Sequence, residues 1–134
     1  MKYLLDTNTV SMLMKGNVPV RRHFEEAIRL GGDISISAIC YYEIKRGLIK
    51  SNAIKQLEEF NNFCETYKPV LLDTLGIFDN AANIYAYLSK TGKVMGDADI
   101  LIGSTALQND FVVVTDNIKH FNRIKNLKVV NWKT

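Results

Sequence analysis

The segment that constrains the fold most is Phe-Val-Val-Val-Thr at residues 111–115. It is apolar and largely β-branched, and no polar residue alternates with the apolar ones, which is typical of a strand buried on both faces. Shorter apolar runs predict further strands at residues 2–5, 34–36, 69–72 and 128–130. Helical patterns separate these runs, which indicates right-handed βαβ crossovers. The sequence therefore predicts an α/β fold with a mostly parallel β-sheet flanked by helices on both faces.

The helices are predicted from apolar periodicity and from the residues that end them. Ser37 is a good N-cap for one helix, and Gly31-Gly32 closes another. The predicted helical ranges are 10–14, 18–30, 38–49, 51–67, 74–90 (or from 73) and 97–108 (or from 99). The chain has 134 residues, of which 47% are hydrophobic. We therefore expect residues 1–134 to form one compact domain with a core of its own.

Composition and spacing exclude several classes of protein. Cys40 and Cys64 are the only cysteines, too few for a disulfide framework or a four-cysteine zinc site. The sequence contains neither a Gly-rich dinucleotide-binding motif nor a P-loop. Its longest apolar runs are strand-sized, and its first residues lack the pattern of a signal peptide. We expect a soluble, cytoplasmic protein with no membrane contact.

Two acidic residues directly follow predicted strands. Asp6 comes after the strand at 2–5, and Asp116 comes after the strand at 111–115. In parallel α/β sheets the functional site lies beyond the carboxyl ends of the strands, so both carboxylates are candidates for it. Each has an ordinary alternative, because Asp6 could be a helix N-cap and Asp116 the start of a turn.

Glu43 is the most informative residue of the predicted helix at 38–49. It shares a face with Ile39 and Cys40, which is the side that we expect to meet the sheet. A carboxylate on such a face costs several kcal/mol unless it has a partner. The alternatives are a Glu43 that reaches water at the edge of this face, or one paired with Lys45 or Arg46.

Two further acids begin the predicted helix near residue 97. Asp97 and Asp99 are two positions apart, which places them about 200° apart around a helix axis. They therefore cannot both point into one site. Asp99 shares a face with the small and apolar Ile102 and Gly103, so we favour it as the functional residue. The alternative is that both acids only cap the helix and complement its dipole.

Together these acids would converge at one edge of one sheet. Carboxylates about 4 Å apart repel by roughly 4 kcal/mol per pair at an effective dielectric constant of 20. A divalent cation would remove that repulsion, and ligands that are all oxygen favour Mg²⁺ or Mn²⁺. Such an ion can activate water and neutralise charge on a phosphodiester.

The distribution of basic residues along the chain also favours a phosphate-containing ligand. The formal net charge is only +3, but the chain after Asp116 carries basic residues and no acidic one: Lys119, Arg123, Lys125, Lys128 and Lys133. A basic surface around a few acids suits a polyanion such as RNA. The alternative is an ordinary solvated lysine-rich face.

Four segments resemble the PIN-domain ribonucleases, and among them the VapC-type toxins of bacterial toxin–antitoxin pairs. They are Tyr-Leu-Leu-Asp-Thr-Asn at 3–8, the helix from Ser37 through Glu43 to Gly47, Gly-Asp-Ala-Asp-Ile-Leu-Ile-Gly at 96–103, and Val-Thr-Asp-Asn at 114–117. Any one of them is common. Their order and spacing over nearly the whole chain make the resemblance specific.

The resemblance implies a compact PIN fold and a Mg²⁺-dependent endoribonuclease, with Mn²⁺ as a substitute. It assigns Asp6 and Asp99 as the principal metal ligands, Glu43 as a ligand or water-positioning acid, and Asp116 as the fourth acid. The remaining residues of the motifs would support the ligands or contact the phosphate: Thr7, Asn8, Asp97, Thr115 and Asn117. The implied partners are an RNA substrate, a VapB-like antitoxin and a second copy of the chain in a homodimer.

This sequence departs from the family pattern at three positions. Gly103 stands where alanine is usual, a small-for-small change that we expect to preserve close packing. Asp97 is an extra acid beside Asp99, which leaves open which of the two ligates the metal. Many relatives place the fourth acid where this chain has Asn117, so the assignment of Asp116 is also open.

The main alternative is a catalytically silent PIN-like module that binds RNA or a protein. An acid at or beside every motif position argues against it. A receiver-like phosphoacceptor domain would need paired acids after its first strand, whereas Asp6 is followed by Thr7 and Asn8. Outside the motifs, we expect Cys40 to be a buried hydrophobe and His120 to be a lone basic residue on the surface.

Overall fold

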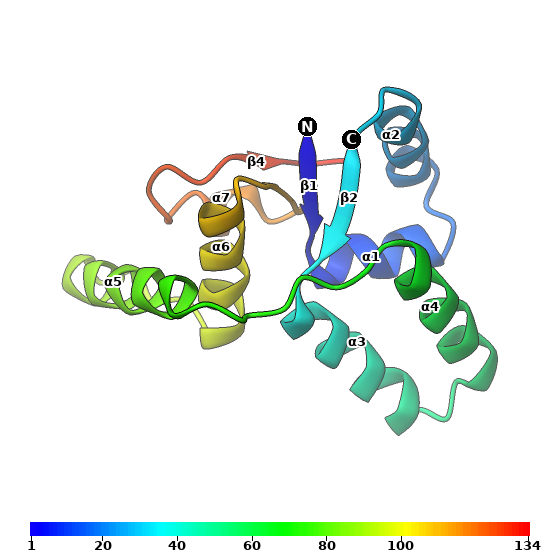
Figure 1. The fold of residues 1–134 in the computed structure, drawn as a ribbon, viewed down its shortest axis with the longest axis horizontal. Helices are drawn as coiled ribbons and strands as arrows, with labels where there is room; N and C mark the ends of the chain where they lie inside the picture. Colours follow the sequence, from blue (N-terminus) through cyan, green and yellow to red (C-terminus); the bar gives the residue numbers. More distant parts are fainter.

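The computed structural model describes all residues from 1 to 134 and contains one four-stranded sheet (Figure 1). All its neighbouring strands pair in parallel, in the spatial order β2-β1-β3-β4. The strands are β1 (Lys2–Leu5), β2 (Asp33–Ile36), β3 (Val112–Val114) and β4 (Val129–Val130). Leu5 is aligned with Ile36 on one side and with Val114 on the other, so β1 and β3 are central and end together.

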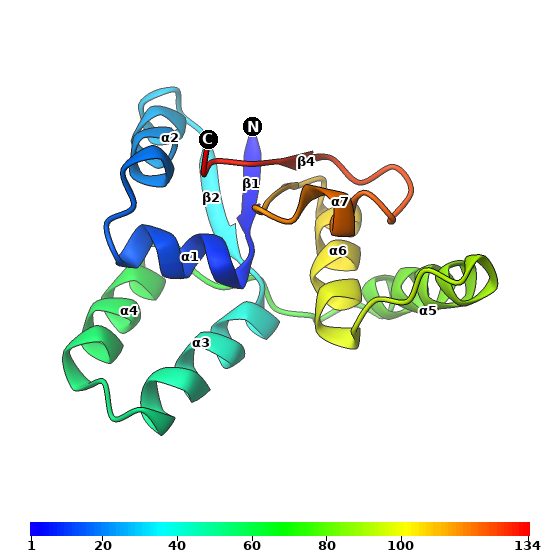
Figure 2. The ribbon, with the colours of Figure 1, turned by 180° about the vertical axis from the view of Figure 1, so that it is seen from behind.

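Seven helices surround the sheet. They are α1 (Thr7–Met14), α2 (Val18–Arg29), α3 (Ala38–Lys50), α4 (Ile54–Thr66), α5 (Leu75–Thr91), α6 (Asp97–Asn109) and α7 (Ile118–Phe121). Seen from either side, α1 to α4 lie on one half of the molecule, and α5 to α7 lie on the other (Figures 1 and 2). None of the helices combines the length and the apolar character needed to cross a membrane.

The alternation of side chains along the central strands explains why helices cover both faces. Leu5 and Val114 join a core with residues of α1 to α4, whereas Leu4 and Val113 join a second core with residues of α5 to α7. Successive side chains of a strand point to opposite faces, so two apolar neighbours require two covered faces. The predicted fold class is confirmed.

The structure differs from the predicted secondary structure in three details: the strand at 69–72, the start of α4, and the short helix α7, which was not predicted. Residues 69–72 form no strand, and only Val70 makes a bridge, to Ser37. β2 ends at Ile36 and α3 begins at Ala38, so little extended backbone is left for Val70 to pair with. The chain after Val70 therefore leaves the sheet edge.

The start of α4 and the presence of α7 also differ from expectation. α4 begins at Ile54 rather than at residue 51, because the Ser51 hydroxyl donates to the Gly47 carbonyl at the end of α3. Asn52 then turns the chain with a left-handed backbone, φ 54°. α7 has only four residues, too few to show a helical period in the sequence.

Candidate active site

Asp6 lies at the carboxyl end of β1 and serves as the N-cap of α1. Its Oδ1 accepts a hydrogen bond from the Thr9 backbone N–H at 2.8 Å, and its own N–H donates to the Val114 carbonyl at 3.0 Å. The Thr9 hydroxyl donates to the same Val114 carbonyl at 3.0 Å. Asp6 is 6% exposed. It is therefore both the N-cap that the sequence offered as an alternative and a carboxylate at the edge of the sheet.

The electrostatic surroundings of Asp6 are unfavourable to its own negative charge. Burial raises the pKa of the Asp6 carboxyl, and the nearby charge of Asp116 raises it further. Hydrogen bonds from Thr115 and Thr9 act in the opposite direction, but burial is the largest effect. Asp6 and Asp116 therefore form a pair of neighbouring carboxylates that a positive ion would stabilise.

Glu43 reaches this edge from α3. The Thr7 hydroxyl donates to Glu43 Oε1 at 2.8 Å, across 36 residues of sequence. Neither basic neighbour on α3 pairs with Glu43, since Lys45 donates to the Tyr41 hydroxyl and Arg46 lies over the Tyr42 ring. Thr7 on α1 is therefore the partner that holds this half-buried carboxylate.

Cys40 on α3 is a buried thiol whose pKa both Asp6 and Glu43 affect. It is fully buried, as predicted. Burial raises the pKa of the Cys40 thiol to about 12, and the negative charges of Asp6 and Glu43 raise it as well. The thiol thus lies close to both carboxylates and stays protonated.

Asp97 and Asp99 occupy the first turn of α6 and point in different directions. The helix N-cap is Gly96, so neither acid has the capping role. Asp99 Oδ2 lies 2.8 Å from His120 Nε2 on α7. Asp97 instead lines a hollow between α5 and α6, beside Phe78. The structure therefore gives Asp97 and Asp99 different surroundings.

The turn between β3 and α7 carries the remaining predicted residues. Thr115 is buried, and its Oγ1 accepts a hydrogen bond from the Asn117 backbone N–H at 3.0 Å. Asp116 is half-buried, whereas the side chains of Asn117 and Asn8 are exposed. The negative charge of Asp116 acts on the Asp6 carboxyl, whereas Asn117 carries no charge.

Sequence reasoning missed two polar contacts. Thr9 lies three residues after Asp6, the position of the helix residue whose N–H an N-cap side chain binds, so its spacing was a usable signal. His120 was expected to be alone on the surface, but its ring is only partly exposed and contacts Asp99. Nothing in the local sequence indicates that pairing, because it depends on how α6 and α7 pack.

The donor set fits Mg²⁺ or Mn²⁺ through a small number of carboxylates. No three of the His, Cys, Asp and Glu side chains are gathered closely enough to hold a metal ion among them. Mg²⁺ does not need such a cage, because it keeps several waters and commonly takes one or two protein carboxylates. The Asp6–Asp116 pair supplies oxygen ligands of that kind, and the burial of Asp6 beside a second negative charge favours a cation there.

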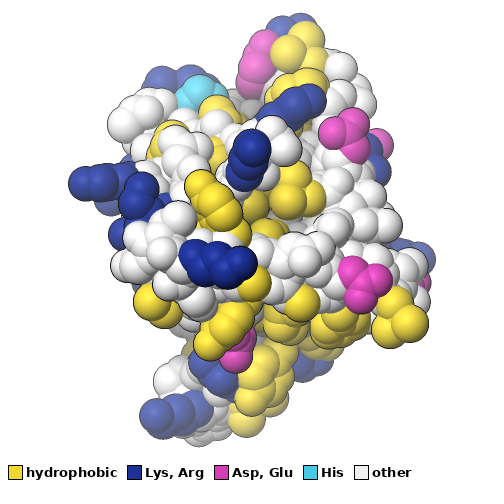
Figure 3. All heavy atoms as spheres, turned by 90° about the vertical axis from the view of Figure 1, so that its left-hand side faces the viewer, with side chains coloured by type: hydrophobic (Ala, Val, Ile, Leu, Met, Phe, Trp, Pro, Cys, Tyr) yellow, Lys and Arg dark blue, Asp and Glu magenta, His cyan; other side chains and the backbone are white.

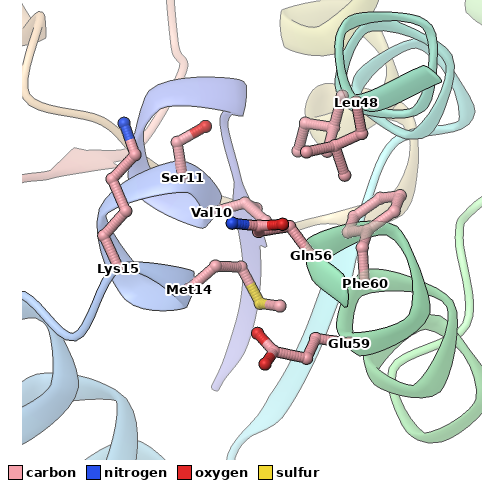
Figure 4. A pocket seen from close by; sticks show the side chains of 9 residues that line it. Val10, Ser11, Met14, Lys15, Leu48, Gln56, Glu59 and Phe60 are labelled. Carbon is pink, nitrogen blue, oxygen red and sulfur yellow. The ribbon is translucent and has the colours of Figure 1, made fainter. Parts of the chain in front are cut away.

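Two further surface features lie outside this edge. A cavity of about 100 Å³ opens between α1, α3 and α4, and Figure 4 shows Val10 and Met14 on one side of it and Leu48 and Phe60 on the other. Figure 3 views the side toward which α5 projects, where Lys and Arg side chains are scattered among apolar ones and few acids are visible. The molecule thus presents, outside the acidic edge, an apolar cavity and a surface on which basic and apolar side chains are mixed.

The chain is similar in sequence to proteins of one known family. The PIN domain family model matches residues 3–127. Ribonuclease VapC2 of Rickettsia felis is 30% identical over 98% of each chain, and the tRNA(fMet)-specific endonuclease VapC of Salmonella typhimurium is 31% identical over 98% of each chain.

Solved structures show the same fold. A chain of the Rickettsia felis VapBC2 complex, bound to a DNA fragment from its promoter, superposes with a TM-score of 0.90 at 26% identity, covering 98% of this chain and 99% of that one. A chain of the DNA-bound VapBC of Salmonella typhimurium gives a TM-score of 0.88 at 28% identity and covers 98% of each chain. The chain belongs to the PIN-domain family, and within that family to the VapC ribonucleases.

Proposed function

We propose that this protein is a divalent-metal-dependent endoribonuclease and the toxin of a toxin–antitoxin pair. The observation that carries the proposal is the buried Asp6 carboxylate at the carboxyl end of β1, with Asp116 beside it. Two neighbouring carboxylates without a basic partner are an arrangement that a cation stabilises. The printed names of the relatives, ribonuclease and endonuclease, support RNA as the substrate.

The roles of the acids are proposed from the family resemblance. Asp6 and Asp99 are the principal metal ligands, with Asp116 beside Asp6 as a further acid of the site. Glu43, fixed by the Thr7 hydroxyl, is a ligand or orients the attacking water. When bound, the ion supplies an activated water and neutralises charge on the scissile phosphate. Hydrolysis then adds hydroxide to phosphorus and a proton to the leaving oxygen.

The protein surface supports a polyanionic substrate. The segment after Asp116 contains no acidic residue, and four of its lysines are exposed: Lys119, Lys125, Lys128 and Lys133. Lysine side chains of this kind contact phosphates and give affinity that falls with salt concentration. We also propose that the protein acts in the cytoplasm, where cellular RNA is present.

We propose two protein partners. The VapBC complexes among the solved relatives support a VapB-like antitoxin, and the apolar cavity between α1, α3 and α4 is a surface that an apolar side chain of such a partner would fill. A second copy of the chain is supported by exposed apolar side chains on α5: Leu75, Phe78, Tyr85 and Tyr87. Light scattering of the purified protein, with and without a VapB-like partner, tests both.

The experiment that tests the nuclease is cleavage of total cellular RNA by purified, antitoxin-free protein with Mg²⁺, with Mn²⁺ and with EDTA. We expect discrete fragments that need the metal and disappear in Asp6→Asn. Asp33→Asn is the matched control, because Asp33 is an exposed acid at the opposite end of the neighbouring strand. No cleavage with any metal, by protein shown to be folded, would contradict the proposal and favour a PIN-like module that binds without turnover.

A further inference from the structure

We propose that His120 is a positioning residue that holds the Asp99 carboxylate in the geometry needed to ligate the metal ion. The inference rests on the proposed function, because it assigns a role within the same metal site. It concerns a residue of α7 that lies outside the acidic motifs. It is carried by the contact between His120 and Asp99 and by the way in which the histidine ring is itself fixed.

The contact has a defined hydrogen-bond direction. His120 Nε2 lies 2.8 Å from Asp99 Oδ2. An ionised carboxylate only accepts hydrogen bonds, so Nε2 must carry the proton and donate it to this contact. One carboxylate oxygen of Asp99 is then held by the imidazole, and the other oxygen stays available for a ligand. Carboxylates that ligate metals are commonly oriented by hydrogen bonds from residues that do not contact the metal themselves.

Buried neighbours fix the histidine ring. Phe121, the next residue, is 2% exposed in the core formed with α5 and α6. The His120 ring stands edge-on to the Phe121 ring, with centroids 5.6 Å apart and planes at 89°. The His120 side chain is 21% exposed, against 40% for Asp99. The more buried partner therefore sets the position of the more exposed one.

The same segment also contacts the other side of the site. The Thr115 side chain lies near enough to lower the pKa of the Asp6 carboxyl, and its Oγ1 accepts the backbone N–H of Asn117, the N-cap of α7. His120 lies three residues further along and contacts Asp99. Residues 115–120 thus touch both principal candidate ligands, which come from β1 and α6 and are 93 positions apart in sequence. The turn between β3 and α7 therefore contributes neighbours to both acids.

An ordinary ion pair on the surface contributes little to the free energy of folding. The test must therefore separate an effect on the position of Asp99 from an effect on stability. His120→Phe keeps an aromatic ring against Phe121 but removes the donor. His120→Gln removes the ring but keeps an N–H donor. His23→Ala is the control, because His23 is the other histidine and contacts the Thr134 carbonyl at the chain end instead.

The main readout is binding of Mn²⁺ to metal-free protein by isothermal titration calorimetry, with the thermal midpoint measured on the same samples. We expect His120→Phe to weaken Mn²⁺ binding about 10- to 100-fold, the usual effect of losing a residue that orients a ligand. His120→Gln should recover most of that loss, and His23→Ala should bind as the wild type does. RNA cleavage by His120→Phe should fail at low Mn²⁺ and return at high Mn²⁺.

A second arm tests whether His120 acts through Asp99. In an Asp99→Asn background, His120→Phe should cause no further loss of Mn²⁺ affinity, because the group that it positions has changed. Unchanged affinity in His120→Phe alone, or equal losses in His120→Phe and His120→Gln, would overturn the proposal. If the wild type cleaves RNA with metal and His120→Phe binds Mn²⁺ normally, only this inference fails. If the wild type neither binds metal nor cleaves RNA, the proposed function fails with it.

Discussion

The two sides of the acidic edge are held in different ways. At the β1 side, Asp6 is buried and bound by the Thr9 backbone N–H, with its own N–H on the Val114 carbonyl of β3. At the α6 side, Asp99 is more exposed, and the contact that the structure gives it is with the His120 side chain. The sheet itself therefore places the first carboxylate, whereas the packing of two helices places the second.

This difference predicts where substitutions affect stability and where they affect only the site. Asp6 is covered by the fold, so its charge is unfavourable in the folded protein without a cation. Asp99 can reach water, so its charge costs the folded state much less.

Asp6→Asn should lower RNA cleavage by about 10³-fold or more, since several kcal/mol of electrostatic stabilisation correspond to about three decades in rate. The same variant should melt at a higher temperature than the wild type at pH 7 in EDTA. Because the folded state raises the pKa of Asp6, the wild type loses stability as the pH rises through that pKa, and the neutral amide escapes this loss. Cleavage assays and calorimetry measure the two effects. A lower melting temperature than that of the wild type would show that the charge of Asp6 does not destabilise the folded state.

Asp99→Asn and Asp97→Asn form a matched pair on one helical turn. We expect Asp99→Asn to reduce the rate of RNA cleavage by about 10²-fold. This is the lower end of the range found when an enzyme loses a general acid or base. Asp97→Asn should change the rate by about twofold or less, because Asp97 is exposed and lines a hollow with Phe78 that no other acid lines. Neither change should shift the melting temperature much. Equal losses in both variants would mean that α6 rotates or unwinds in the working enzyme.

Gly103→Ala tests the packing that holds the α6 side together. A Cβ at Gly103 would run into Ile124 Cδ1, and Ile124 is 3% exposed just after α7. Overpacking of this kind costs about 1–3 kcal/mol, against a gain of about 1 kcal/mol in helix propensity. We expect a net loss of stability in urea denaturation.

Two variants make that measurement specific. Ile124→Val removes the clashing methyl, so it should recover part of the loss when combined with Gly103→Ala. Gly47→Ala on α3 meets no atom within 4 Å and should be stabilising by about 1 kcal/mol through helix propensity alone. If Gly103→Ala proves as stabilising as Gly47→Ala, the close approach of Ile124 to α6 is wrong.

The smallest expected effect concerns the cysteines of the β1 side. Burial raises the pKa of the Cys40 thiol to about 12, so very little thiolate exists at pH 8. Cys64 is slightly more exposed, at 8% against 0% for Cys40. Iodoacetamide should therefore modify Cys64 before Cys40 in the folded protein, as followed by mass spectrometry, with Cys64→Ser as control. Faster labelling of Cys40 would reveal local opening beside Asp6.

Much of the site's framework could be predicted from local patterns. The apolar strands at 2–5 and 111–115 place Asp6 and Asp116 at the same edge, because parallel strands end together. Helix periodicity separates Asp97 from Asp99 by about 200°, and the structure gives them different surroundings. Local patterns could not show that residue 103 must be smaller than alanine. The side chain that a Cβ there would meet belongs to Ile124, which lies 21 positions away in sequence.

The amino-acid sequence by itself determined the four strands of the sheet, most of the helices, and the positions of Asp6 and Asp116 after strands and of Asp97 and Asp99 at the start of a helix. These depend on residues a few positions apart, whose periodicity and capping act within one strand or one helical turn. Only the tertiary structure decided that Thr7 holds Glu43 and that His120 holds Asp99. Those contacts join residues 36 and 21 positions apart, and their formation depends on how whole helices pack against the sheet.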